Sequence, residues 1–174
     1  IKTPDYDSQY VYFALHFQPE STTLPKGSIY RDQILAIKRL REILPAEMMI
    51  YVKEHPRSLI ADIRNKNFRS IDFYREIMML EGIQLLHPEV DSAELIENSS
   101  LVSTITGSPL IEALPQGVPA VAFGNSIVEG CESLHKIISS TVSPRSAVET
   151  LLRNSPAEVK ADFLNFLKCP DWHK

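Results

Sequence analysis

The sequence is poor in cysteine and has no long apolar run, and each shortage excludes a class of protein. Its 174 residues include 2 cysteines, Cys131 and Cys169, which lie far apart and without the spacing of metal ligands. This pattern argues against a disulfide scaffold and is typical of a reducing compartment. No apolar stretch approaches the roughly 20 residues that span a bilayer. We therefore expect neither a metal site nor a membrane-spanning helix.

The sequence also lacks an excess of positive charge. Its net charge is −4 at pH 7, which disfavours general binding to nucleic acid or to an anionic membrane, although a small basic pocket could still hold one phosphate. Hydrophobic residues make up 44% of the chain and charged residues 23%. These values are ordinary for a globular protein and exclude disordered and fibrous classes. The length suffices for one domain with its own core.

Several catalytic motifs are missing as well. The chain has no G-x-G-x-x-G, no P-loop and no G-x-S-x-G elbow, so a common dinucleotide cofactor, P-loop chemistry and a Ser-His-Asp hydrolase are unsupported. We interpret His135 and His173 as surface residues. The chain begins at Ile1 with neither an initiator methionine nor a signal-peptide pattern. We expect residues 1–9 to be a linker and residues 10–174 to form one domain excised from a longer protein.

What the sequence does contain is an alternation of short apolar runs with helical periodicity. Apolar stretches typical of buried strands lie near residues 10–15, 48–53, 84–86, 101–105 and 120–123. Helices are expected over residues 30–44, 70–80, 91–98 and 108–114, and the pattern after residue 124 is helical, with helix starts at Ser143 and Ser155. Asp91 with Glu94 and Ser155 with Glu158 have the spacing of capping boxes. Ser108 is a good N-cap, and Pro109 suits the first helical position. Strands that alternate with helices at these intervals predict a Rossmann-like α/β domain, with a mainly parallel sheet flanked by helices on both faces.

Polar residues at the strand ends carry the functional signal. The strand at residues 48–53 runs into Lys53, Glu54, His55 and Pro56, and in a parallel sheet the loops after the strands share the edge where ligands bind. Backbone N–H groups at a strand-to-helix junction favour an anion, and Lys53 and His55 would add donors there. This is the chemistry of a phosphate site. A solvated Lys–Glu pair with a loop histidine explains the stretch equally well.

A later strand end resembles a small phosphate cradle. Gly107 allows a ligand to approach the backbone closely, while Thr106, Ser108 and the start of the next helix supply donors. Glu112 lies one turn further on. Its carboxylate could accept hydrogen bonds from two ribose hydroxyls, or it could be an acidic residue favoured only by its place near a helix N-terminus. Gln33, near the start of an earlier helix, could turn toward the strand ends, but we interpret it as solvated.

Several short motifs of the chain occur in the same order in a known family. They are LHFQPE at residues 15–20, YRDQ at 30–33, YVKEHP at 51–56, TITGS at 104–108 with Glu112 and Ala113, and GVP at 117–119. Over roughly residues 10–125 the chain resembles the bacterial capsule polysaccharide biosynthesis and export family, whose members are similar to Kdo-transferring glycosyltransferases of the GT-B type. In such enzymes two Rossmann-like domains face each other, and the C-terminal one binds the nucleotide sugar.

The resemblance implies that this chain is that C-terminal domain, with a nucleotide sugar as substrate and no cofactor or metal. It also implies a catalytic base on an N-terminal domain of the same protein and a glycan or glycolipid acceptor. The implied location is the cytoplasm, with peripheral association at the inner face of the bacterial membrane. The implied site residues are Lys53, His55 and Pro56 at the donor phosphate, Thr106, Gly107 and Ser108 closing around it, Glu112 at the ribose, and Gln18 and Glu20 lining the pocket.

The nature of the donor and of the reaction stays open at this point. CMP-linked Kdo or a related acidic sugar is the first expectation, with UDP sugars behind it. A sugar-nucleotide epimerase has similar architecture but needs acid and base carboxylates near the sugar, for which only Glu20 and Glu54 are candidates. Pro109 and Leu110 stand where the family commonly has another small residue. This departure keeps open a degenerate domain that binds a glycan or a partner without catalysis.

Overall fold

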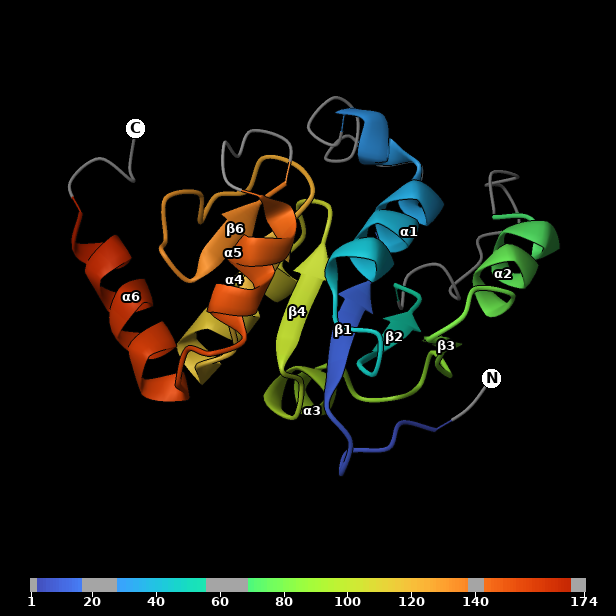
Figure 1. Ribbon diagram of the computed structural model, residues 1–174, viewed down its shortest axis with the longest axis horizontal. Helices are drawn as coiled ribbons and strands as arrows, with labels where there is room; N and C mark the ends of the chain where they lie inside the picture. Colours follow the sequence, from blue (N-terminus) through green and yellow to red (C-terminus); the bar gives the residue numbers. More distant parts are fainter. Residues whose placement is uncertain (1–2, 17–27, 56–68, 138–142, 170–174) are drawn as a thin grey trace.

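Six short segments, most of them apolar, pair side by side as parallel strands (Figure 1). The computed structural model describes residues 3–16, 28–55, 69–137 and 143–169. The predicted Rossmann-like α/β class is confirmed, and each predicted strand end lies within one residue of the observed one. The order across the sheet is β3-β2-β1-β4-β5-β6. The strands are β1 (Tyr10–Ala14), β2 (Met49–Lys53), β3 (Ile83–Leu85), β4 (Leu101–Thr104), β5 (Ala120–Ala122) and β6 (Leu134–Lys136).

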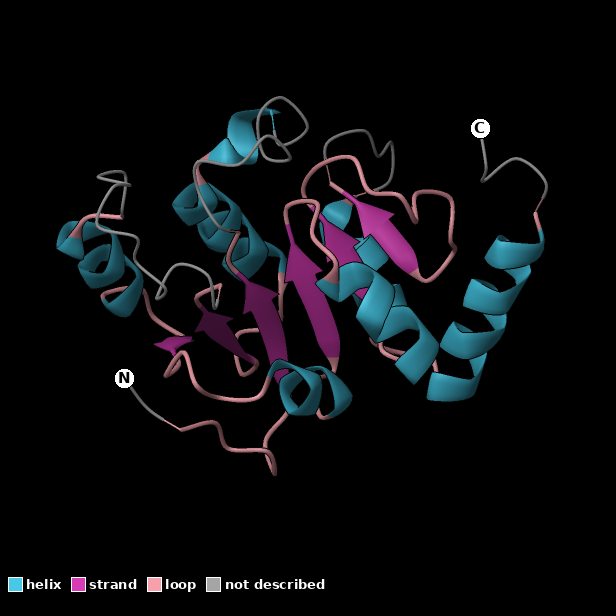
Figure 2. Ribbon diagram, turned by 180° about the vertical axis from the view of Figure 1, so that it is seen from behind, coloured by secondary structure: helices cyan, strands magenta, loops and turns pink. Residues whose placement is uncertain are grey.

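The helices form two layers, one on each face of the sheet. One face is covered by η1 (Ser28–Arg31), α1 (Gln33–Ile43), α2 (Ile71–Met78) and α5 (Pro144–Leu151), as Figure 1 shows. The other face, seen in Figure 2, is covered by α3 (Ser92–Glu97), α4 (Pro109–Ala113), η3 (Leu114–Gln116) and α6 (Pro156–Lys168). Each face of the sheet therefore has its own apolar core.

The central strand β1 shows how the sequence pattern produces these layers. All five of its residues are buried. Val11 and Phe13 pack into the core on the α1 side, whereas Tyr10, Tyr12 and Ala14 pack into the core on the α3 side. Side chains alternate across a strand, so a strand that is buried on both faces must be apolar at nearly every position. This requirement is why the sequence placed β1 correctly.

Side-chain caps define several helix starts. Asp32 accepts hydrogen bonds from two backbone N–H groups in the first turn of α1, so the single helix predicted over residues 30–44 is a short 3₁₀ turn followed by α1. Asp91 caps α3 in the same way, but of the capping box predicted for Asp91 and Glu94 the described bonds include only the Asp91 half. The predicted capping box of α6 is confirmed, because Ser155 and Glu158 each bond the backbone N–H of the other.

The edge strand β6 was missed by the sequence, which predicted only helices after residue 124. Its three residues pair in parallel with β5 through Ala120↔Leu134, Val121↔His135 and Ala122↔Lys136. A strand this short, with polar residues at two positions, carries too little periodicity to be recognised. His135 is half-buried, its Nε2 is buried without a hydrogen-bond partner among the described residues, and burial lowers its pKa. The interpretation of His135 as a surface residue is corrected accordingly, and His173 lies outside the described residues.

The segment before β1 touches the sheet without adding an element to it. Residues 3–9 contain no helix or strand. The backbone N–H of Asp5 donates to the Tyr51 hydroxyl over 3.0 Å, and the Tyr6 ring lies 6.4 Å from that of Tyr10 between centroids. Within the described ranges, no helix has both the length and the apolar character needed to cross a membrane.

Gly117 links the end of η3 to β5, and its surroundings allow a specific prediction about stability. Its φ is 88°, and an added Cβ would lie 2.7 Å from the carbonyl oxygen of Pro156 in α6. We expect Gly117→Ala to lower the free energy of unfolding by about 2–4 kcal/mol, because a left-handed backbone and a clash act together. Urea denaturation measures this loss.

Gly130 is the matched control for that substitution. Its φ is 102°, but an added Cβ would meet nothing closer than Phe166 at 3.9 Å. Gly130→Ala should therefore lose only the backbone contribution, about 1–2 kcal/mol. Equal losses for the two variants would contradict the close packing of α6 on η3.

Candidate functional site

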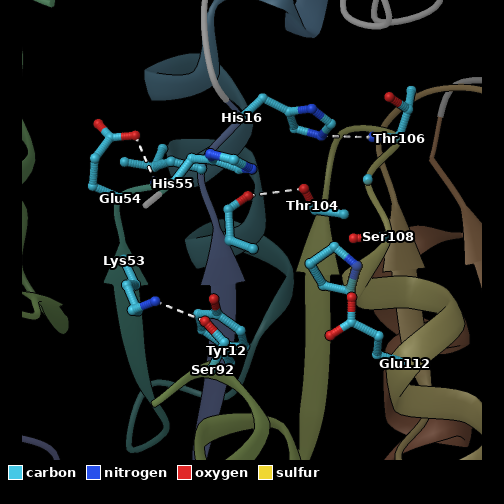
Figure 3. A pocket seen from close by; sticks show the side chains of 14 residues that line it. Tyr12, His16, Lys53, Glu54, His55, Ser92, Thr104, Thr106, Ser108 and Glu112 are labelled. Atoms are coloured by element: carbon cyan, nitrogen blue, oxygen red, sulfur yellow. Dashed lines mark hydrogen bonds between the residues drawn. The ribbon is translucent and has the colours of Figure 1, made fainter. Parts of the chain in front are cut away.

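A cavity of about 480 Å³ opens where β1, β2 and β4 end (Figure 3). These strands flank the point at which the chain, having built β2 and β3 on one side of β1, crosses to its other side. Open α/β sheets bind ligands at such a topological switch point. Of the predicted site residues, Gln18, Glu20 and Pro56 lie outside the described residues. The others all line this cavity: Lys53, His55, Thr106, Gly107, Ser108 and Glu112.

Alternation along the end of β2 sends Lys53 and Glu54 to opposite sides of the sheet. Lys53 lies in register with Ala14 and points into the cavity, where its Nζ donates to the Ser92 hydroxyl over 2.7 Å (Figure 3). Only 3% of Lys53 is exposed. Burial lowers the pKa of its ammonium group, and the Asp91 carboxylate partly opposes this. The alternative of a solvated Lys–Glu pair is thus excluded, since Glu54 is also buried.

Glu54 is held by donors on the α1 side of the sheet. One of its oxygens accepts the His55 backbone N–H over 2.7 Å, and the other accepts the Tyr74 hydroxyl over 2.8 Å and the Arg69 guanidinium. Burial, followed by the bond to Glu54, raises the pKa of Tyr74 to about 12. A carboxylate that already accepts three hydrogen bonds is poorly suited to carry protons to and from a sugar. This arrangement weakens the case for the acid–base pair that an epimerase would require.

The loop after β4 is tied to the end of β1 by two hydrogen bonds. The buried Thr104 hydroxyl donates to the Ala14 carbonyl over 2.8 Å, and the Thr106 backbone N–H donates to Nε2 of His16 over 3.1 Å. An added Cβ on Gly107 would meet the His16 ring at 3.2 Å, whereas the predicted close approach of a ligand to this glycine stays a prediction. The approaching group within the protein is an imidazole.

Ser108 and Pro109 start α4 in a way that the sequence predicted only in part. Pro109 is the first helical residue, as expected. The Ser108 side chain makes no capping hydrogen bond; instead its carbonyl accepts from Ile111 and Glu112. Within the described part of the chain, the backbone N–H groups of Gly107 and Ser108 donate to no protein acceptor. They are two donors at the mouth of the cavity.

Tyr12 and Ser92 belong to the cavity but were not foreseen. Burial raises the pKa of Tyr12 to about 12, with the Glu112 carboxylate adding to the rise and a hydrogen bond from Ser92 opposing it. Glu112 is therefore close enough to Tyr12 to act on it, from the α4 side of the cavity (Figure 3). Nothing in the sequence marked Ser92 beyond the Asp91 cap before it.

Gln33 is the clearest error in the site prediction. It is only 1% exposed rather than solvated. Its side-chain oxygen accepts the His16 backbone N–H over 2.8 Å, and its side-chain nitrogen donates to the His16 carbonyl over 3.2 Å. The Gln33 side-chain amide thus satisfies both backbone polar groups of His16, which in a longer strand would pair with the backbone of a neighbouring strand. Its place in the YRDQ motif was the signal that could have found it.

Comparisons with known proteins bear on the fold. No protein-family model matches the sequence, and no curated protein sequence matches it. Among solved structures, KpsC of Thermosulfurimonas dismutans, a beta Kdo 2,7 transferase, matches with a TM-score of 0.59 and 16% identity over 95% of this chain and 56% of its own. The UDP-GlcNAc 2-epimerase of Methanocaldococcus jannaschii, in complex with UDP-GlcNAc and UDP, matches with a TM-score of 0.56 and 17% identity. The match covers 91% of this chain and 45% of the epimerase chain.

A third solved structure has the same architecture. MnaA of S. aureus with UDP has a TM-score of 0.53 and 14% identity, over 91% of this chain and 41% of its own. The fold is shared. At these identities the likeness extends to the Rossmann-like architecture alone, and the chain spans only about half the length of each of these proteins.

The buried pair of Glu54 and Arg69 gives a second stability prediction. Both side chains are less than a tenth exposed. Glu54→Gln should lower the free energy of unfolding by about 3–5 kcal/mol, because it leaves the Arg69 charge buried without its partner. The double variant Glu54→Leu/Arg69→Met removes both charges and should lose markedly less. If the double variant were as unstable as Glu54→Gln in urea denaturation, the loss would not come from an unpaired charge.

Proposed function

We propose that this chain is the nucleotide-sugar-binding domain of a glycosyltransferase that builds a bacterial surface polysaccharide. The observation that carries the proposal is the cavity at the switch point of the sheet. Cationic and N–H donors gather along one side of it and a carboxylate lies across from them. A nucleotide has a group to match each side: an anionic phosphate for the donors and a ribose diol for the carboxylate. The order of family motifs along the chain adds support.

The phosphate would lie against the ends of β2 and β4. Lys53 supplies a desolvated ammonium group and His55 a ring nitrogen. Gly107 and Ser108 offer backbone N–H groups that have no acceptor among the residues that the structure describes. A desolvated cation gains more from an anion than an exposed one does, since its charge is less screened by water. These groups would stabilise the leaving nucleotide phosphate as the glycosidic bond breaks, a role that requires no metal.

The rest of the proposed enzyme lies outside this chain. The acceptor, a glycan or glycolipid, would bind against an N-terminal domain that also carries the catalytic base. The solved structures of similar fold are about twice as long as this chain, which is in keeping with a second domain. The isolated 174 residues should therefore bind a nucleotide without transferring a sugar. We place the whole enzyme in the cytoplasm, peripherally at the inner face of the membrane.

The proposed donor is CMP-Kdo or a related acidic sugar, with UDP sugars as the second choice. The capsule-family motifs support the former, and a Kdo transferase is among the proteins of similar fold. Sugar-nucleotide epimerases share the fold too, but the Glu54 carboxylate is already bonded to Arg69 and Tyr74. Pro109 and Leu110 were the reason to consider a degenerate domain that binds without catalysis. In the structure Pro109 fits the first position of α4 and lines the cavity without closing it.

Calorimetric titration with CMP, UDP and GDP tests the proposed function. We expect one of them to bind saturably and His55→Ala to weaken that binding by about 1.5–3 kcal/mol, the value of a hydrogen bond to a charged group. His87→Ala is the matched control, because His87 is exposed, also precedes a proline and lies outside the cavity. Equal effects of the two variants, or no binding of any nucleotide, would contradict the proposal.

A second titration tests the assignment of Glu112 to the ribose. Glu112→Gln should weaken binding of the preferred nucleotide by about 1–2 kcal/mol, because a neutral amide accepts hydrogen bonds less strongly than a carboxylate does. The 2′,3′-dideoxy form of the same nucleotide has no diol to bind. The variant and the unaltered protein should bind it almost equally. A loss of the same size with the dideoxy form would mean that Glu112 acts elsewhere.

A further inference from the structure

We propose that His16 is a positioning residue that holds the loop after β4 in its anion-binding shape, acting as a neutral imidazole protonated at Nδ1. This inference rests on the proposed function, because it concerns how the same site is shaped. His16 is 6% exposed and is absent from the residues that the sequence assigned to the nucleotide. It contacts Thr106 and Gly107 in the loop after β4 directly, and it is linked to the end of β2 through Arg69 and Glu54.

The backbone of His16 is fixed on both of its polar groups. Gln33 accepts its N–H over 2.8 Å and donates to its carbonyl over 3.2 Å, and that carbonyl also accepts from the Arg69 guanidinium. Arg69 is itself anchored, since it pairs with Glu54 and its guanidinium carbon lies 4.7 Å from the centre of the Phe73 ring. Holding one residue with two buried side chains leaves the imidazole little freedom to shift.

The imidazole then fixes the loop and, in doing so, fixes its own protonation. Nε2 lies 3.1 Å from the Thr106 backbone nitrogen, and a backbone N–H can only donate. Nε2 must therefore carry no proton, which places the proton of the neutral ring on Nδ1. A doubly protonated ring would set two N–H groups against each other here. The next residue, Gly107, packs against the same ring, because a Cβ there would be 3.2 Å from both Cε1 and Nε2.

One set of hydrogen bonds thus joins both halves of the proposed phosphate site. On the β4 side, His16 holds Thr106, directly before the backbone N–H groups of Gly107 and Ser108, which donate to no acceptor in the described ranges. On the β2 side, Arg69 contacts Glu54, whose other oxygen accepts the His55 N–H. The relative placement of His55 and the loop at 106–108 is therefore set through the end of β1. The anion-binding groups are positioned before any ligand arrives, which reduces the free energy lost in ordering them on binding.

Nuclear magnetic resonance of the unaltered protein gives the most direct test. We expect the His16 side chain to show a pyridine-type Nε2 and a pyrrole-type Nδ1, with a scalar coupling between Nε2 and the Thr106 backbone nitrogen across the hydrogen bond. This measurement needs no variant and no ligand. A pyrrole-type Nε2 would overturn the proposal, since a protonated Nε2 cannot accept the Thr106 N–H.

Two variants of nearly equal size then separate positioning from simple packing. His16→Gln keeps an acceptor close to the place of Nε2, whereas His16→Leu does not. Hydrogen exchange of the Thr106 amide should accelerate by about tenfold or more in His16→Leu, as expected for a lost hydrogen bond, and much less in His16→Gln. Affinity for the preferred nucleotide should follow the same order. His87→Leu, at an exposed histidine, should change neither quantity.

The outcomes distinguish this inference from the proposed function. If His16→Leu left Thr106 exchange and nucleotide affinity unchanged, the positioning role would be refuted even though nucleotide binding itself stood. If the unaltered protein bound no nucleotide, the proposed function would fail, and the exchange and coupling data would still decide whether His16 holds the loop. Equal losses in His16→Gln and His16→Leu would mean that the ring acts by its shape alone, which also overturns the proposal.

Discussion

The parallel pairing of β1 with both β2 and β4 is the constraint on which the rest of the molecule depends. Ala14 lies in register with Lys53, and Phe13 lies in register with both Val52 and Ser103. All three strands therefore end at the same edge of the sheet. Because β1 is buried on both faces, a shift of one residue would move its tyrosines into the core that Val11 and Phe13 now fill and disrupt the packing on both sides, so the register is strongly fixed. The cavity follows from this register.

The site contains more buried polar groups than a stable core requires. Lys53, Glu54, Gln33, His16 and Thr104 are all buried. Burying such groups is unfavourable unless each finds a partner, and in this structure they bond mainly to one another and to the ends of the strands. The consequence is that the protein itself holds most of the polar side chains around the cavity in place. Lys53 differs from the rest, because burial lowers the pKa of its ammonium group and so disfavours its own charge.

The sequence predicted the parts of this structure that follow from local patterns. Strands buried on both faces have continuous apolar runs, and the Asp91 and Ser155 caps have recognisable spacing, so these elements were found. Lys53, His55 and the residues at 106–108 were predicted to gather at one edge because they directly follow such strands, and they line the same cavity. Gln33 and Ser92 were missed, since their burial depends on which elements pack above them, a tertiary property. β6 was missed because Leu134–Lys136 pairs through its backbone and leaves almost no pattern in its side chains.

The direction in which Glu54 points bears on the kind of chemistry that this edge can perform. Alternation along β2 places Lys53 and His55 at the cavity and turns Glu54 toward Arg69 and Tyr74. An epimerase must take up and release protons at the sugar, which requires carboxyl groups free to change state. A transferase needs only that charge developing on the leaving phosphate be met by fixed donors. Of the described residues, Lys53, His55 and the loop at residues 106–108 bring donors to the cavity, and Glu54 and Glu112 are the carboxylates that line it. The Glu54 carboxylate is already bonded to Arg69 and Tyr74. The same alternation that buries β2 on both faces of the sheet therefore decides which of its last side chains face the cavity and which are held by the protein.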